Sequence, residues 1–190
     1  MLHKPKTKLL RLTTFLSPVK KCVNLKCVIT LLVVFGIAHL LNAQDKVLLH
    51  DQEKLFTTVE RKQIDSLLQY YYKAKGNYVS VVTTDTLDIN PGDYSKRFAE
   101  HQNLSGLQNN YGLVLLMSRK QELIYLTGTG QLVHLKDLPQ VQDALTGIIS
   151  AGIPDLQEKR TAEGVMKICG KAMKFIDEVA KIMQEPAPKR

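Results

Sequence analysis

The chain has 190 residues, of which 44% are hydrophobic, 6% aromatic and 23% charged, and this composition fits one globular domain. Its eleven glycines, seven prolines and three cysteines are too few for a collagen-like, disulfide-rich or long low-complexity protein. The formal net charge of +8 is uneven, because residues 1–27 hold seven of the 26 basic residues and no acid. The remainder is nearly neutral, with 19 basic and 18 acidic residues, so we expect no nucleic-acid partner.

The first 43 residues have the pattern of an export signal. Basic residues precede an uncharged apolar run over residues 28–41, and the small residue Ala43 follows it. The run of about 15 residues suits a signal peptide and is shorter than the roughly 20 residues that span a bilayer. We therefore predict cleavage before Gln44 and a periplasmic or other extracytoplasmic location. The alternative is an uncleaved anchor in the inner membrane, and the membrane would then be contacted only through this segment.

The residues after the leader predict an alternation of helices and strands. Thr57 and Glu60 have capping-box spacing, which predicts a helix that begins there and ends at Gly76. The β-branched residues of segment 78–84 indicate a strand. Residues 85–92 have turn chemistry and predict a loop, and Asp93 is expected to cap the next helix.

A hairpin is predicted next. The continuous apolar run over residues 112–118 is typical of a strand buried on both faces, and residues 122–127 form its partner. Gly128 and Gly130 follow the second strand. Because they match neither the dinucleotide-binding pattern nor a P-loop, we interpret them as a tight turn.

Two helices are predicted to end the domain. The first begins near Asp137 and ends at residues 152–154, and the second runs from about residue 160 to 183. Cys169 lies in the apolar stripe of the last helix and is expected to be buried and unreactive. This order of elements predicts a three-layer α/β/α sandwich with a small mixed sheet over residues 44–183. Residues 184–190 are expected to form a polar tail.

Known catalytic motifs are absent from the sequence, which contains neither GxSxG nor HExxH nor a paired Cys/His arrangement. His101 is expected at the surface or its boundary rather than as a metal ligand. Carboxylates on predicted loops remain, at Asp51, Asp85, Asp88 and Asp137. Such hard oxygen ligands suit Ca²⁺ or Mg²⁺, although the same residues also serve as caps and turn formers.

The order of elements and several residue patterns resemble the TPM domain family over roughly residues 47–177. The patterns lie at residues 47–51, 78–84, 109–118 and 125–130, and at Asp137, Pro154 and Gly164. The resemblance implies an α/β/α sandwich in an exported protein. Members of the family are linked to divalent-cation binding, to phosphatase activity and to the support of membrane complexes.

The sequence departs from the family pattern where an ion would bind. Residues 109–111 fill a stretch in which the family usually has an acid, and Leu132 stands where it often has Glu. Residues 160–161 replace an acidic–aromatic pair, whereas Asp51 and Asp137 match the family.

A residual metal site of Asp51, Asn110 and Asp137 is therefore expected, provided that their loops converge at one edge of the sheet. The neutral Asn110 removes a charge, so we expect no required cofactor and at most weak, millimolar binding of Ca²⁺ or Mg²⁺. The expected function is a non-catalytic accessory or binding module in an envelope or membrane protein complex. The alternative is a divalent-metal-dependent phosphatase.

Overall fold

The computed structural model describes residues 46–104, 110–135 and 138–184. A four-stranded sheet forms the middle layer, in the order β1-β2-β3-β4. Strands β1 (Leu49–Asp51), β2 (Tyr78–Thr83) and β3 (Tyr111–Ser118) are parallel, and β4 (Leu123–Gly130) is antiparallel to β3. The predicted mixed sheet and the β3–β4 hairpin are therefore confirmed.

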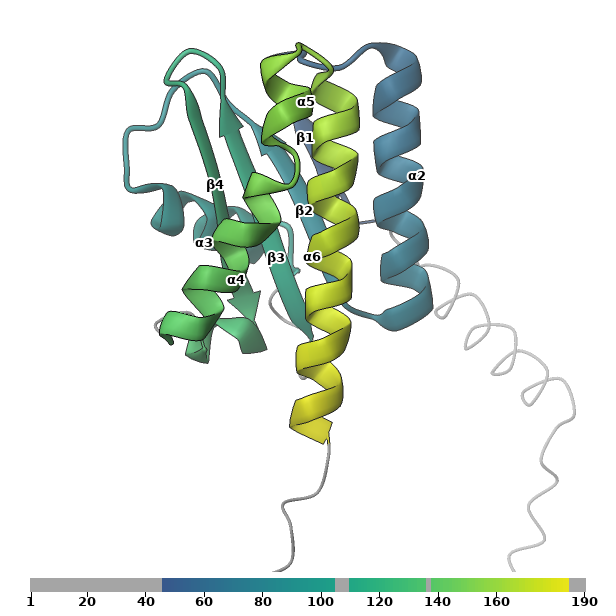
Figure 1. The fold of residues 1–190 in the computed structure, drawn as a ribbon, viewed down its shortest axis with the longest axis vertical. Helices are drawn as coiled ribbons and strands as arrows, with labels where there is room; N and C mark the ends of the chain where they lie inside the picture. Colours follow the sequence, from purple (N-terminus) through teal and green to yellow (C-terminus); the bar gives the residue numbers. More distant parts are fainter. Residues whose placement is uncertain (1–45, 105–109, 136–137, 185–190) are drawn as a thin grey trace, which may run out of the picture. The chain divides into compact units, whose positions relative to one another are not determined.

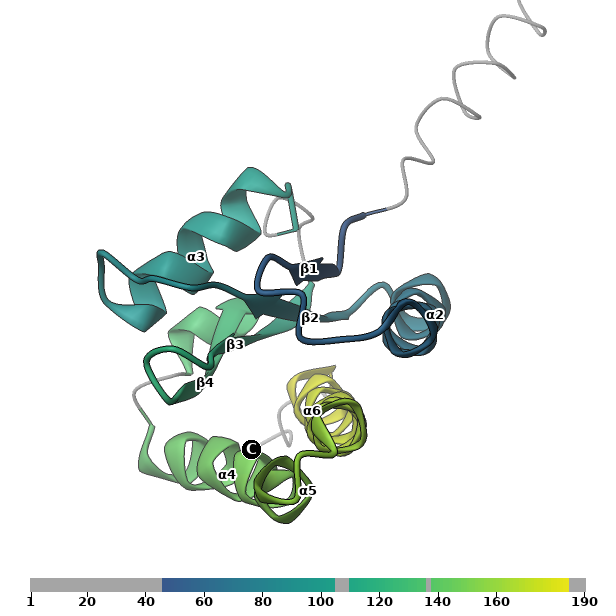
Figure 2. The same ribbon diagram turned by 90° about the horizontal axis from the view of Figure 1, so that it is seen from above.

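Helices pack on both sides of this sheet, as the sandwich prediction required (Figure 1). One face carries α3 (Pro91–His101), and the other carries α2 (Thr58–Lys75), α4 (Pro139–Ser150) and α6 (Thr161–Gln184) (Figure 2). The short helix α5 (Ile153–Gln157) packs on α6. The core lies between the layers, because every residue of β2 and β3 is buried.

The first helix follows its sequence signals closely. The side chain of Thr57 accepts from Glu60 N at 3.3 Å, and the Glu60 carboxylate accepts from Thr57 N at 2.7 Å, so the predicted capping box is confirmed. Gly76, with φ of 70°, ends the helix in the left-handed conformation. Tyr71 is buried against α6, where its hydroxyl donates to Asp177 at 2.9 Å.

Several boundaries differ from the predictions. The α3 helix begins at Pro91 behind an Asn90 cap rather than at Asp93, because proline is well suited to the first helical position. Strand β4 continues through Gly128 to Gly130, so the predicted tight turn after it is wrong. Residues 152–154 do not simply end a helix, since α5 begins at Ile153. The three-residue β1 and the 3₁₀ turn η1 (Gln131–His134) had no sequence signal of their own.

Cys169 is fully buried in the α6 stripe, as predicted. Burial without a charged neighbour disfavours the thiolate and raises the pKa of this thiol to about 12. Cys169 is therefore a packing residue rather than a nucleophile.

The buried carboxylate of Asp155 in α5 forms two ion pairs with half-exposed basic side chains, one just before α6 and one within it. Lys167 Nζ lies 2.5 Å from Asp155 Oδ2, and Arg160 Nη2 lies 2.5 Å from Asp155 Oδ1. The hydrogen bond from Lys167 and the charge of Arg160 hold the pKa of Asp155 below its ordinary value. A carboxyl whose pKa is lower in the folded than in the unfolded state stabilises the fold at pH values above its ordinary pKa. This contribution is lost as the pH falls through the pKa of the folded state.

The Asp155→Asn variant is expected to unfold at lower urea concentration than the wild type at pH 7. The difference should shrink as the pH falls below about 4, because the unfolded wild-type chain then takes up the proton, and it should vanish at lower pH, once the folded carboxyl is protonated as well. Urea titrations of both proteins between pH 7 and pH 2 measure this. A difference that stays constant over that range contradicts the assignment.

No helix in the described ranges is both long enough and apolar enough to cross a membrane. The predicted leader over residues 1–43 lies outside those ranges, as does the predicted tail except for Gln184. The cleavage site and the anchor therefore stay predictions.

Candidate functional site

Asp51, the first predicted metal ligand, lies at the carboxyl end of β1 with its side chain fully buried. Its Oδ1 accepts from Leu55 N at 2.9 Å and from the Thr83 hydroxyl at 2.8 Å. Its Oδ2 accepts from Phe56 N at 3.3 Å and lies 3.9 Å from Arg61 Nε. Both oxygens are thus engaged within the protein, and Asp51 fastens the end of β1 to the start of α2.

Glu53 has a similar role that the sequence did not reveal. Both of its carboxylate oxygens accept from Arg119 N, at 3.0 and 3.2 Å, and its own backbone N donates to the Thr83 hydroxyl. This residue ties the loop after β1 to the β3–β4 turn. No sequence signal could have found it, because its partner is 66 residues away in a turn of ordinary composition.

Asn110, the second predicted ligand, lies at the other end of the sheet. The register pairs Asp51 with Thr83 and Thr83 with Met117, whereas Asn110 precedes the first residue of β3. At about 3.3 Å per residue, the seven residue steps from Asn110 to Met117 separate these two positions by about 23 Å along the strands. The expected convergence of Asp51 and Asn110 is therefore wrong. In parallel strands, a residue at the carboxyl end of one strand and a residue just before the amino end of another lie at opposite ends of the sheet.

Asp137, the third predicted ligand, lies outside the described residues. Within the described ranges, no three His, Cys, Asp or Glu side chains lie close enough together to hold a metal ion. Leu132, which stands where the family often has Glu, is buried in the core and packs close to Gly128. A carboxylate at this position would lose its hydration, so the local structure favours leucine here.

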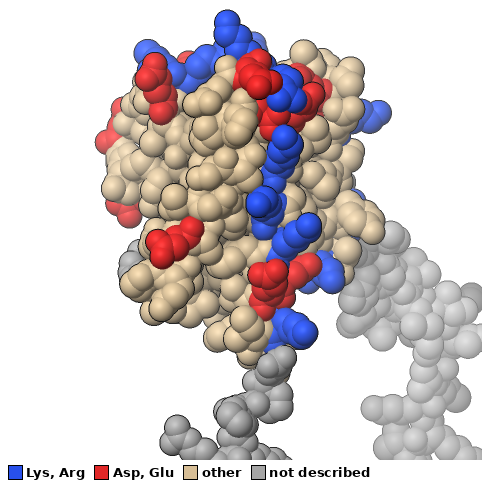
Figure 3. All heavy atoms as spheres, viewed as in Figure 1, with Lys and Arg blue, Asp and Glu red and all other residues tan. Residues whose placement is uncertain are grey.

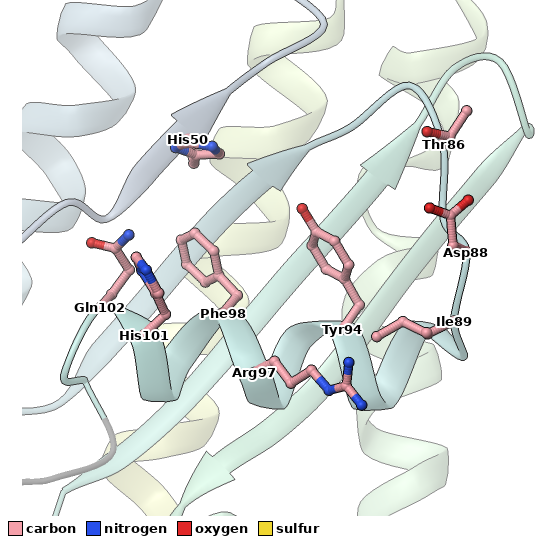
Figure 4. A pocket seen from close by; sticks show the side chains of 9 residues that line it. All are labelled: His50, Thr86, Asp88, Ile89, Tyr94, Arg97, Phe98, His101 and Gln102. Atoms are coloured by element: carbon pink, nitrogen blue, oxygen red, sulfur yellow. The ribbon is translucent and has the colours of Figure 1, made fainter.

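An open groove lies on the face of the sheet that carries α3, between α3, β1 and residues 84–90. It encloses about 650 Å³, a size typical of sites that bind organic ligands or peptide side chains. Figure 4 shows its lining, to which all three segments contribute: His50, Thr86, Asp88, Ile89, Tyr94, Arg97, Phe98, His101 and Gln102. We call it the α3 groove.

The groove exists because α3 is short and stands to one side. It packs against β3 and β4, and no described helix covers the same face of β1 and β2. His50 of β1 points from this uncovered area towards α3, and its ring centroid lies 5.7 Å from that of Phe98 at an angle of 50° (Figure 4). Tyr94, Phe98 and His101 lie on one side of α3 because their spacing is helical.

The α3 groove combines aromatic surface with hydrogen-bonding groups. Phe98 and Tyr94 offer ring faces, whereas His50, His101 and Gln102 gather at one end and Asp88 lies at the other (Figure 4). One carboxylate is too few for a hard cation, which prefers six or more oxygens. The lining instead suits a ligand that presents both an apolar group and polar atoms. His101 is exposed at the rim, as predicted.

Comparison with known proteins agrees with this architecture. The family model of the TPM domain matches residues 49–175, which is more than half of the chain. The chain belongs to the TPM domain family. A comparison with curated proteins finds no match.

Two solved structures are similar to this TPM domain. The N-terminal domain of a protein from P. gingivalis is 20% identical, with a TM-score of 0.58 over 73% of this chain and 87% of the other. The BA42 protein of the psychrophilic bacterium Bizionia argentinensis is 13% identical, with a TM-score of 0.56 over 67% of this chain and 85% of the other. At these identities, the likeness concerns the fold alone.

Proposed function

We propose that this TPM domain is an exported, non-catalytic binding module that engages a protein of the cell envelope through the α3 groove. The observation that carries the proposal is the groove itself, an open, aromatic-lined groove on the sheet face that, among the described elements, α3 alone covers. The buried Asp51 and Cys169 support a role without catalysis, because neither is available to a substrate. The basic, apolar leader supports export.

Site-specific photo-crosslinking in living cells tests the proposed site. A photoreactive phenylalanine analogue at His101, on the groove rim, is expected to yield a discrete crosslinked partner band. The control position is Tyr70, which is 75% exposed on α2 and away from the groove. Equal crosslinking from both positions, or none from His101, would contradict the proposal.

Export is tested separately. Mass spectrometry of the protein from the membrane and periplasmic fractions of expressing cells should identify Gln44 as the mature N-terminus. Recovery of the full-length chain from the cytosol contradicts export, and recovery of the full-length chain from the membrane supports the anchor instead.

The competing hypothesis is a divalent-metal-dependent phosphatase. It predicts that the purified protein hydrolyses phosphate monoesters only with Ca²⁺, Mg²⁺ or Mn²⁺, since phosphoryl transfer needs charge stabilisation. The binding-module proposal predicts no turnover above the buffer rate. Metal-dependent turnover that Asp137→Asn abolishes would establish the phosphatase instead.

A further inference from the structure

A second groove lies between α4 and α6, on the sheet face opposite the α3 groove. Its floor consists of Ala144, Gly147 and Ile148 from α4 and Phe175 from α6, and it encloses about 420 Å³. A Cβ atom placed on Gly147 would meet no other atom within 4 Å, so the space above this glycine is open. The floor is thus apolar and recessed, which suits bulky apolar side chains that enter from outside.

Basic side chains stand along one wall of this groove. Lys171 and Lys174 line it, and Lys167 and Lys181 continue the same face of α6. Their spacing places all four in one row about 21 Å long, at 1.5 Å per residue. Figure 3 shows the corresponding column of basic side chains along α6, which acidic side chains interrupt near its lower end.

This positive charge is partly compensated, because Glu178 lies in the same row between Lys174 and Lys181. Lys167 is paired with Asp155, but no ion pair occurs within the described ranges for Lys171, Lys174 or Lys181. Glu178 is the one acidic residue that lines the groove. The wall therefore offers free ammonium groups directly beside an apolar floor.

We propose that the α4–α6 groove docks an acidic amphipathic helix of a partner protein. The apolar face of such a helix fills the recess over Gly147 and Phe175, and carboxylates three or four residues apart pair with Lys171 and Lys174. A concave apolar recess favours a helix over a lipid surface, which would be too flat to reach the floor. This inference concerns a different face of the sheet and does not depend on the α3 groove.

A designed peptide tests the proposal with the full-length protein. The probe is an 18-residue helix with leucines along one face and glutamates along the other, labelled for fluorescence anisotropy. Micromolar binding is expected, weakening with added salt because the lysines are exposed. The Lys171→Glu/Lys174→Glu variant is expected to lose at least tenfold in affinity. Gly147→Leu, which fills the recess, should lose a similar factor.

Matched controls separate the effect of this groove on peptide binding from the effect of the protein's net charge. The Lys62→Glu/Lys120→Glu variant makes the same charge change away from the groove and should bind as the wild type does. Equal weakening in both double variants overturns the proposal, as does equal binding of a scrambled peptide that lacks an apolar face. Vesicles of phosphatidylglycerol and phosphatidylcholine form the last arm. If the protein binds these vesicles but not the peptide, and the binding depends on Lys171 and Lys174, the surface is a membrane-binding surface and the helix proposal is overturned.

Discussion

Replacement of Asp51 with alanine is expected to lower the free energy of unfolding by about 3 kcal/mol. The variant removes acceptors from two backbone N–H groups, at Leu55 and Phe56, and from the buried hydroxyl of Thr83. Buried donors without an acceptor cost about 1–3 kcal/mol each, and partial relaxation of the loop reduces the sum. Urea denaturation of the purified protein at pH 7 measures the effect.

The matched control for Asp51 is Asp88. This residue is exposed on the loop beside the α3 groove, so Asp88→Ala should change stability by less than about 0.5 kcal/mol. The loss of stability in Asp51→Asn should lie between those in Asp88→Ala and Asp51→Ala. The amide keeps one acceptor oxygen but places an NH₂ group beside other donors. A cost below about 1 kcal/mol for Asp51→Ala would show that Asp51 does not hold this loop.

Gly112→Ala is the second substitution with a large expected effect, a loss of about 3 kcal/mol or more. Gly112 pairs with Tyr78 across β2 and β3, and a Cβ atom on Gly112 would overlap the Tyr78 ring. The ring cannot move aside, because it is fully buried and its hydroxyl donates to Thr129 at 2.7 Å. The two strands must therefore shift apart locally, which disturbs their packing and their hydrogen bonds.

A double-mutant cycle isolates this clash. In a Tyr78→Ala background the ring is gone, so Gly112→Ala should cost less than about 1 kcal/mol. Gly170→Ala is the second control, since a Cβ on this α6 glycine meets no atom within 4 Å. It should stabilise the protein by up to about 1 kcal/mol. Additive costs for Tyr78→Ala and Gly112→Ala would contradict the overlap.

Local sequence signals predicted the fold well where one side chain acts on its own backbone. The capping box at Thr57 and the left-handed Gly76 both depend on neighbours within a few residues. The buried strand β2 was predicted from its β-branched residues, and β3 from its continuous apolar run. In contrast, the three-residue β1 forms only because β2 offers it a parallel partner, and α5 forms only where Gly152 and Gly164 let two helices approach closely. Such partners are distant in sequence and leave no local pattern.

The candidate site was predicted less well than the fold. A carboxylate at the end of a strand can bind an ion or cap a loop, and only the positions of Thr83 and Arg61 decide between these roles for Asp51. The predicted partner Asn110 lies at the opposite end of the sheet. The α3 groove could not be predicted, because it results from where α3 packs rather than from any motif.

A calcium titration tests most directly the claim that Asp51 is a structural residue rather than a ligand of an essential ion. Isothermal calorimetry of the purified full-length protein at pH 7 is expected to show no saturable Ca²⁺ binding below the millimolar range. Asp51→Asn should melt at lower temperature than the wild type but give the same calorimetric trace. Saturable wild-type binding at micromolar Ca²⁺ that is lost in Asp51→Asn would contradict the account.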